Sequence, residues 1–166
     1  MRVIGIDPGL TRTGFAIVER EGVRARLVDM GVVRTSPARP AAARLAELRA
    51  AVTEVFGAGR PEVAAVERLF FNANVRTAMA VGQAAGVVLA SAAEAGVDVA
   101  TSTPTEVKQS VAGHGAAPKS QVAAMAASAL GLAAAPRPAD AADACALALC
   151  HLNRAGLDVA IAKARR

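Results

Sequence analysis

Residues 2–9 read Arg-Val-Ile-Gly-Ile-Asp-Pro-Gly, and this stretch decides the fold. The apolar run from Val3 to Ile6 predicts a fully buried strand, and Pro8-Gly9 predicts a turn directly after it. Asp7 stands between strand and turn, where a carboxylate costs free energy unless something compensates its charge. The stretch therefore predicts a buried strand that ends in an acid with a chemical task.

Three further acids occupy comparable settings. Glu67 closes the apolar run 63–66, while Asp140 and Asp143 lie three residues apart at the start of an alanine-rich helical stretch and share one helix face. A pair of divalent metal ions is the simplest shared compensator for these charges. Oxygen ligands suit Mg²⁺, and two ions about 3.5–4 Å apart can activate water and stabilise a leaving oxygen. We expect Asp7 to bridge the two ions.

Each acid taken alone also has a simpler interpretation. Asp7 fits a common turn, or a phosphate-cradling turn of the kind found in actin-like ATPases. Glu67 can pair with Arg68 or a nearby Arg as a solvated acid, and Asp140 can stabilise a helix N-terminus through the helix dipole. The combination of two strand acids and a helical acid pair is far more specific than any one of them. The sequence has no His/Cys spacing typical of zinc sites.

The remaining sequence alternates strands and helices after an opening three-stranded meander. Apolar periodicity predicts strands over 2–7, 13–19, 25–34, 62–67 and 97–100. Helix signals predict helices over 40–56, about 72–94, 103–111, 118–130 and 139–154. Gly57 should end the first helix, and Asn72 or Asn74 should cap the second. This order is typical of the α/β class, a mixed sheet with helices on its faces. We expect a single domain over 1–156 and a frayed tail over 157–166.

Composition favours a basic protein of the cytoplasm. A chain of 166 residues fits one domain with a proper core, and its net charge of +5 favours a nucleic-acid partner. Cys145 and Cys150 lie five residues apart on one expected helix, which indicates two buried free thiols. The N-terminus lacks the apolar stretch of a signal peptide, and residues 78–93 are too few to span a bilayer comfortably. We therefore expect a cytoplasmic protein with no membrane partner.

Taken together, four motifs resemble the RuvC crossover junction endonuclease family. They are Ile4-Gly5-Ile6-Asp7-Pro8-Gly9, Glu67 with Phe70, Lys119-Ser120-Gln121-Val122, and Asp140-Ala-Ala-Asp143-Ala. The resemblance covers nearly the whole chain with order and spacing intact. It implies a ribonuclease-H-like fold with a mixed five-stranded sheet flanked by helices. It also implies a homodimer that resolves Holliday junctions, four-way DNA junctions of recombination and repair, by symmetric paired nicking that leaves ligatable ends.

The resemblance also assigns the site. It implies that Asp7, Glu67, Asp140 and Asp143 are catalytic ligands of two Mg²⁺ ions per active site, with Mn²⁺ as a substitute. It further implies that the RuvA and RuvB branch-migration proteins are partners.

DNA contacts follow from the same resemblance. Lys108 and Lys119 would correspond to basic residues near the scissile phosphate, and Phe70 to an aromatic that stacks on junction bases, an interaction worth about 1–3 kcal/mol per base. Arg76 is expected to add a phosphate contact. The residues alone leave a structural role open for each, as a solvated helix face or a core anchor. His114 is left undecided between a general base, a DNA contact and a plain loop residue.

The helix expected near 72–94 carries small and apolar residues at helical spacing, among them Met79, Gly82, Gly86 and Leu89. This face either packs on its own sheet or forms a two-fold interface, and the resemblance favours the interface. Paired cuts need two active sites related by symmetry.

Two other classes of protein fit the sequence less well. A junction binder with an inactive site is disfavoured because all four carboxylates are present. An actin-like ATPase fragment would need a second lobe and a second turn of the same kind, which this chain lacks.

Overall fold

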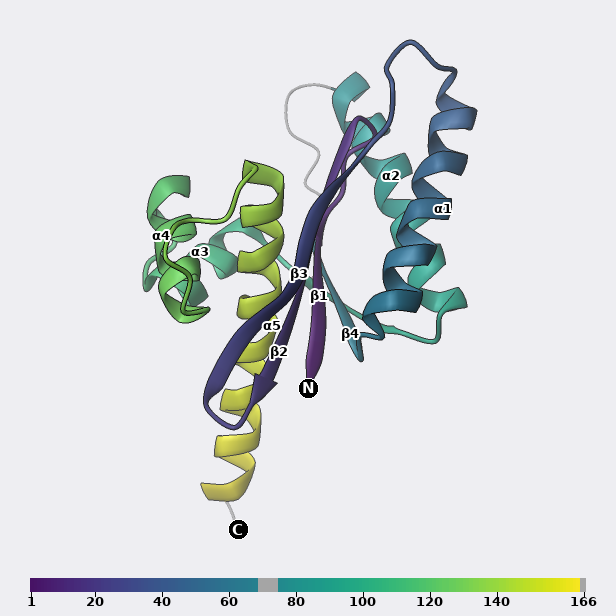
Figure 1. Cartoon of the computed structure of the whole chain (residues 1–166). Helices are drawn as coiled ribbons and strands as arrows, with labels where there is room; N and C mark the ends of the chain where they lie inside the picture. Colours follow the sequence, from purple (N-terminus) through teal and green to yellow (C-terminus); the bar gives the residue numbers. More distant parts are fainter. Residues whose placement is uncertain (69–74, 165–166) are drawn as a thin grey trace.

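The computed structural model describes residues 1–68 and 75–164, and side chains within 1–68 and 78–157. Its strands form one five-stranded sheet, and helices cover both faces of that sheet (Figure 1). The strands are β1 Arg2–Asp7, β2 Arg12–Glu21, β3 Arg24–Arg34, β4 Val63–Glu67 and β5 Asp98–Ser102. The helices are α1 Ala41–Gly59, α2 Val75–Glu94, α3 Pro104–Ala112, α4 Lys119–Ala129 and α5 Ala139–Ala164. The predicted mixed α/β sheet is confirmed.

The strand that contains the deciding stretch lies at the centre of the sheet. The strand order is β3-β2-β1-β4-β5, so β1 has a neighbour on each side. It pairs antiparallel with β2 and parallel with β4, and β4 pairs parallel with β5. A hairpin-connected meander therefore makes one half of the sheet, and crossover connections through helices make the other.

Side chains of β1 alternate between two separate cores. Ile4 and Ile6 point into the core beneath α1 and α2, where they meet Leu48, Val52 and Val88. Val3 points into the opposite core, which is built largely from α5 with contributions from α3 and α4. Because side chains along a strand alternate with a period of two, Asp7 falls on the same face as Val3 and Gly5, facing α5.

Two glycines let α5 lie directly against the sheet. A Cβ atom at Gly5 would lie 1.9 Å from the carbonyl oxygen of Ala144, and one at Gly14 would lie 2.1 Å from the carbonyl oxygen of Asp140. Real Cβ atoms do not approach that closely, so any side chain here would displace the helix. The first turns of α5 are therefore fixed against β1 and β2 by backbone contact.

Two helices end later than predicted. Gly57 does not end the first helix, because α1 continues to Gly59 and is capped by Arg60 in the left-handed conformation, whose N–H donates to the Phe56 carbonyl. Gly59 packs closely there: a Cβ would lie 2.5 Å from Ile17 Cδ1. Likewise α5 continues to Ala164 rather than ending near 154. The predicted caps of α2, Asn72 and Asn74, lie outside the described residues.

Two compositional expectations can be compared with the structure. Cys145 and Cys150 are both buried and free, and burial raises the pKa of the Cys145 thiol to about 12. Within the part of the chain that is described, no helix combines the length and the apolar character that crossing a membrane requires. The boundary at 156 and the frayed tail stay predictions.

The glycine contact predicts the effect of a single methyl group. We expect Gly5→Ala to lower the free energy of unfolding by about 2–3 kcal/mol, because overpacking against backbone forces α5 to move. Gly57→Ala is the matched control: no atom lies within 4 Å of its Cβ position, and alanine in a helix is favoured over glycine by about 0.5–1 kcal/mol. Urea denaturation of both variants tests this, and equal stabilities would contradict it.

Candidate active site

The two strand acids lie at the same end of the sheet. Strands β1 and β4 are parallel, and their register pairs Ile6 with Val66, the residues that precede Asp7 and Glu67. Gly5 and Ala65 are also paired, and Ala65 belongs to the core on the α5 side. Both acids therefore emerge side by side at the carboxyl ends of neighbouring strands, on the face that α5 covers.

The two helix acids come from the first turns of α5. Asp143 lines one pocket together with Asp7 and Glu67, and Lys108 and Lys119 complete its polar lining. Asp140 lies one turn earlier, where Gly14 allows the helix backbone to touch β2. The structure thus brings all four predicted acids to one region, and three of them to one pocket.

Asp7 is the most strongly perturbed of these acids. Its pKa is raised to about 7, first by burial and then by the negative charges of Asp143, Glu67 and Asp140, against a smaller lowering by Lys119. Burial and the charge of Asp143 also raise the pKa of Glu67. A carboxylate whose pKa is perturbed by burial and neighbouring acids in a pocket marks a functional site more often than a structural one.

Basic side chains hold the two helix acids. The Lys119 ammonium donates to Asp143 Oδ2 at 2.7 Å, and this bond raises the pKa of Lys119, so the group stays protonated. Arg12 donates from Nε to Asp140 Oδ2 at 2.8 Å, and its Nη2 donates to the same oxygen. Among the described residues, no three His, Cys, Asp or Glu side chains are arranged to hold a metal ion together. Asp140 and Asp143 engage the basic partners Arg12 and Lys119.

The acids nevertheless fit divalent cations well. They supply only hard oxygen donors, which Mg²⁺ and Mn²⁺ prefer. The raised pKa of Asp7 means that its ionised form lacks sufficient positive charge nearby, and a cation would supply that charge. Pairing of Glu67 with Arg68 is not supported, because Arg68 donates to Thr101 Oγ1 at 3.4 Å instead.

The predicted DNA contacts are only partly described. Lys108 and Lys119 both line the pocket, and the Lys119 side chain is 79% exposed. Phe70 lies outside the described residues, and so does the side chain of Arg76. His114 is exposed and hydrogen-bonds Gln121 at 3.3 Å, outside the pocket lining. It contacts none of the four acids.

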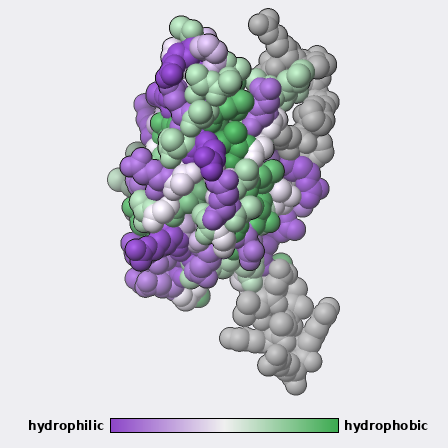
Figure 2. All heavy atoms as spheres, turned by 90° about the vertical axis from the view of Figure 1, so that its right-hand side faces the viewer, coloured by the Kyte–Doolittle hydropathy of each residue, from purple (hydrophilic) through white to green (hydrophobic). Residues whose placement is uncertain are grey.

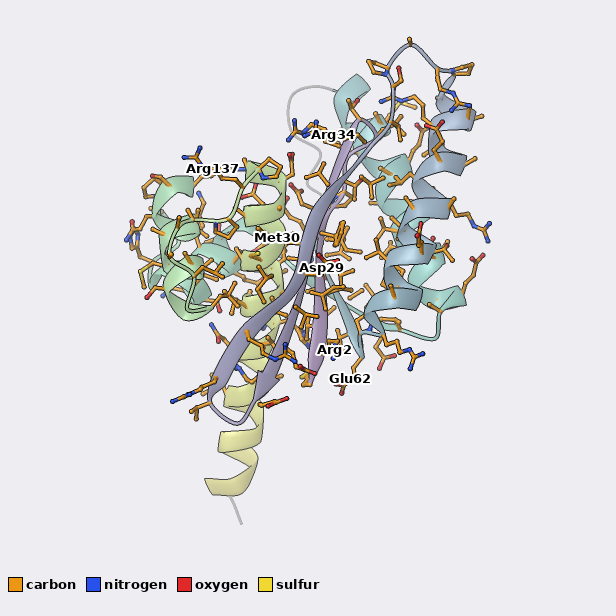
Figure 3. All side chains as sticks on the ribbon, viewed as in Figure 1. Arg2, Asp29, Met30, Arg34, Glu62 and Arg137 are labelled. Atoms are coloured by element: carbon orange, nitrogen blue, oxygen red, sulfur yellow. The ribbon has the colours of Figure 1, made fainter. Side chains whose placement is uncertain are left out.

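Arg12 is the site residue that sequence reasoning missed. It is the first residue of β2, five residues after Asp7, yet its partner Asp140 is 128 residues away. The sequence signal for Arg12 was its position two residues before Gly14, because residues two apart on a strand share a face. Two exposed arginines, Arg34 at the end of β3 and Arg137 ahead of α5, lie at the same end of the molecule (Figure 3).

Comparisons with known proteins agree with this site. Residues 3–151 match the family described as "Crossover junction endodeoxyribonuclease RuvC". The protein of that name from Frankia casuarinae is 52% identical, over 93% of this chain and 90% of the relative. The Thermus thermophilus RuvC structure has a TM-score of 0.88 and 46% identity, and the alignment covers 95% of this chain and 97% of that one. A second structure, of T. thermophilus RuvC in complex with Holliday junction substrate, has a TM-score of 0.87, 45% identity, and coverage of 95% and 96%.

The central β1 strand, the glycine-mediated packing of α5 and the gathered acids thus occur in a chain about half identical to characterised relatives over nearly its full length. This chain has the ribonuclease-H-like fold and belongs to the RuvC family of crossover junction endodeoxyribonucleases.

Proposed function

We propose that this chain resolves four-way DNA junctions by hydrolysing phosphodiester bonds of the DNA. The active site would be formed by four acids: Asp7, Glu67, Asp140 and Asp143. One observation carries the proposal: Asp7, Glu67 and Asp143 share a pocket with Lys108 and Lys119, and burial among like charges raises the pKa of Asp7 to about 7. Such a site suits a cation and a phosphate better than a structural role. The relative from T. thermophilus was solved in complex with Holliday junction substrate, which supports the same substrate here.

Two divalent ions per site, Mg²⁺ or Mn²⁺, are the proposed cofactor. Asp7, Glu67, Asp140 and Asp143 would hold them. The chemistry that such ions supply is polarisation of the scissile phosphate and a nucleophilic water at neutral pH. Asp7 is half-buried and lines the pocket with Glu67 and Asp143, so these three acids would face the scissile bond together.

The lysines are proposed to hold the DNA backbone. Lys119 stays protonated beside Asp143, so it acts as a positive charge and not as a general base. Its exposed ammonium can reach a phosphate oxygen and stabilise developing charge. Lys108 comes from α3, whose start is fixed by a capping box in which Thr103 and Glu106 hydrogen-bond each other's backbone N–H. The helix therefore presents Lys108 at a fixed point of the pocket wall. Phe70 and Arg76 are proposed to stack on junction bases and contact phosphate.

A homodimer through α2 is proposed to place two such sites for paired cuts. Among the described residues, no atom outside the neighbouring turns of α2 lies within 4 Å of a Cβ position at Gly82 or Gly86, which favours an open face over packing on the sheet. Met79 and Leu89 on the same helix are 59% and 41% exposed. Figure 2 faces α1 and α2 and shows apolar atoms gathered along the middle of this side of the molecule. Small and apolar residues left open on one helix favour close approach of a second copy. RuvA and RuvB are proposed partners on the strength of the family alone.

DNA cleavage should depend on Asp7. Asp7→Asn should reduce nicking of a labelled mobile four-way junction in Mg²⁺ by at least about 100-fold, the usual scale for losing a central catalytic group, while junction binding is retained. Asp98→Asn is the control, because Asp98 is exposed and starts β5 at the opposite end of the sheet. Tight binding without cleavage by the wild-type chain, in either metal, would instead favour a structural junction binder.

The stability of the fold should depend on pH and on metal through Asp7. The pKa of Asp7 is raised in the folded state, from 3.8 to about 7, so the folded protein binds the proton more tightly and loses stability as pH rises between these values. Asp7→Asn should therefore raise the melting temperature of metal-free protein by several degrees at pH 8 and much less at pH 4.5. Differential scanning calorimetry checks this. Adding Mg²⁺ at pH 8 should stabilise the wild type more than the variant; equal shifts would argue against a metal at Asp7.

The proposed dimer should require a small residue at Gly86 on α2. Gly86→Arg should convert the protein to a monomer and replace paired nicks by single ones, because the new side chain has room in the monomer but not at a close helix contact. Gly57→Arg on α1 is the matched control, since that position is equally open. Light scattering after gel filtration gives the mass of each. A wild-type chain that is monomeric at working concentration would refute the interface.

A further inference from the structure

Arg12 is held beside Asp140 by the packing of β2 against α5. Arg12 is the first residue of β2, and Gly14 lies two residues on, so both face the same side of the sheet. Gly14 meets the backbone of Asp140 directly. The backbone contact therefore leaves the Arg12 side chain next to the Asp140 carboxylate, with no freedom of register.

The contact engages a single carboxylate oxygen. Arg12 Nε lies 2.8 Å from Asp140 Oδ2, and Nη2 donates to that oxygen as well. Asp140 is the one acid of the four that does not line the pocket shared by Asp7, Glu67 and Asp143. Arg12 thus binds the acid that stands apart from the other three.

We propose that Arg12 serves as the counter-cation of Asp140 and competes with the divalent metal for this carboxylate. The inference rests on the proposed metal site. A guanidinium stays charged at every working pH, so Asp140 is neutralised whenever metal is absent. A metal ion that approaches Asp140 must displace the two N–H donors or accept a positive charge beside it, and either requirement weakens binding.

The competition has a consequence for the enzyme. Metal should bind more weakly at the Asp140 side of the site than its carboxylates alone would allow. The Arg12 side chain is 38% exposed, so it can swing into solvent, toward the DNA backbone, once metal takes its place. Arg12 therefore sets the metal concentration at which the site fills.

Calorimetric titration of Mn²⁺ into metal-free protein, without DNA, tests the inference. We expect Arg12→Gln to bind Mn²⁺ about three- to tenfold more tightly than the wild type, since a partly exposed charge is screened and its effect is modest. Arg12→Lys keeps the charge without the two-donor fork and should fall between them. Arg34→Gln is the matched control. Arg34 lies opposite Arg12 in the register of β2 and β3, and it does not bond Asp140. The substitution removes the same charge. Its affinity should stay within about twofold of the wild type.

The outcomes separate the two proposals. A wild type that binds no Mn²⁺ at millimolar concentration would overturn the metal site, and this inference with it. A wild type that binds Mn²⁺ while Arg12→Gln binds equally or more weakly would overturn this inference alone, because Arg12 would then orient Asp140 and not compete for it. Equal tightening in Arg34→Gln would also overturn it, since a general charge effect would suffice. Melting temperatures of metal-free variants confirm that each protein titrated is folded.

Discussion

The contact between α5 and the central strands is the constraint on which this structure depends. Gly5 and Gly14 remove the two side chains that would otherwise separate helix and sheet. The α5 backbone then lies on β1 and β2, and its first turns come to rest above the end of β1. Without this contact, Asp143 would not face Asp7 and Glu67 in one pocket, and Asp140 would not lie beside Arg12.

The same contact creates the electrostatic problem of the site. Four carboxylates are brought to the end of a buried sheet, and burial together with mutual repulsion raises the pKa of Asp7 to about 7. The protein answers in part with its own cations. Lys119 and Arg12 each engage one helix acid through its Oδ2 atom, while Asp7 and Glu67 keep raised pKa values. The protein's own side chains thus neutralise two of the four acids, and the proposed metal ions would neutralise the others.

Helices on the two faces have different tasks. On one face α3, α4 and α5 supply Lys108, Lys119 and Asp143 to the pocket, and α5 places Asp140 beside it. On the other face α1 and α2 cover Ile4 and Ile6, and α2 leaves its glycines open to solvent. Chemistry and the proposed self-association are separated by the sheet, so a change on the α2 face need not disturb the acids. This division follows from the alternation of β1 side chains between the two cores.

The sequence by itself determined the class of fold, the buried strand over 2–7 and the order of elements, and it singled out the four acids that the structure gathers at one end of the sheet. Those features depend on local patterns: an apolar run that ends in Asp7, periodic apolar residues in the helices, and an acid pair three residues apart. It misplaced the ends of α1 and α5, because Gly57 is tolerated in an exposed helix interior and the close approach of Gly59 to Ile17 is a tertiary contact. Only the tertiary structure decided that Arg12 binds Asp140, that Asp140 stands outside the shared pocket, and that Arg68 turns away from Glu67. Each of these depends on which side chains meet across elements far apart in the chain, and no local pattern encodes that meeting.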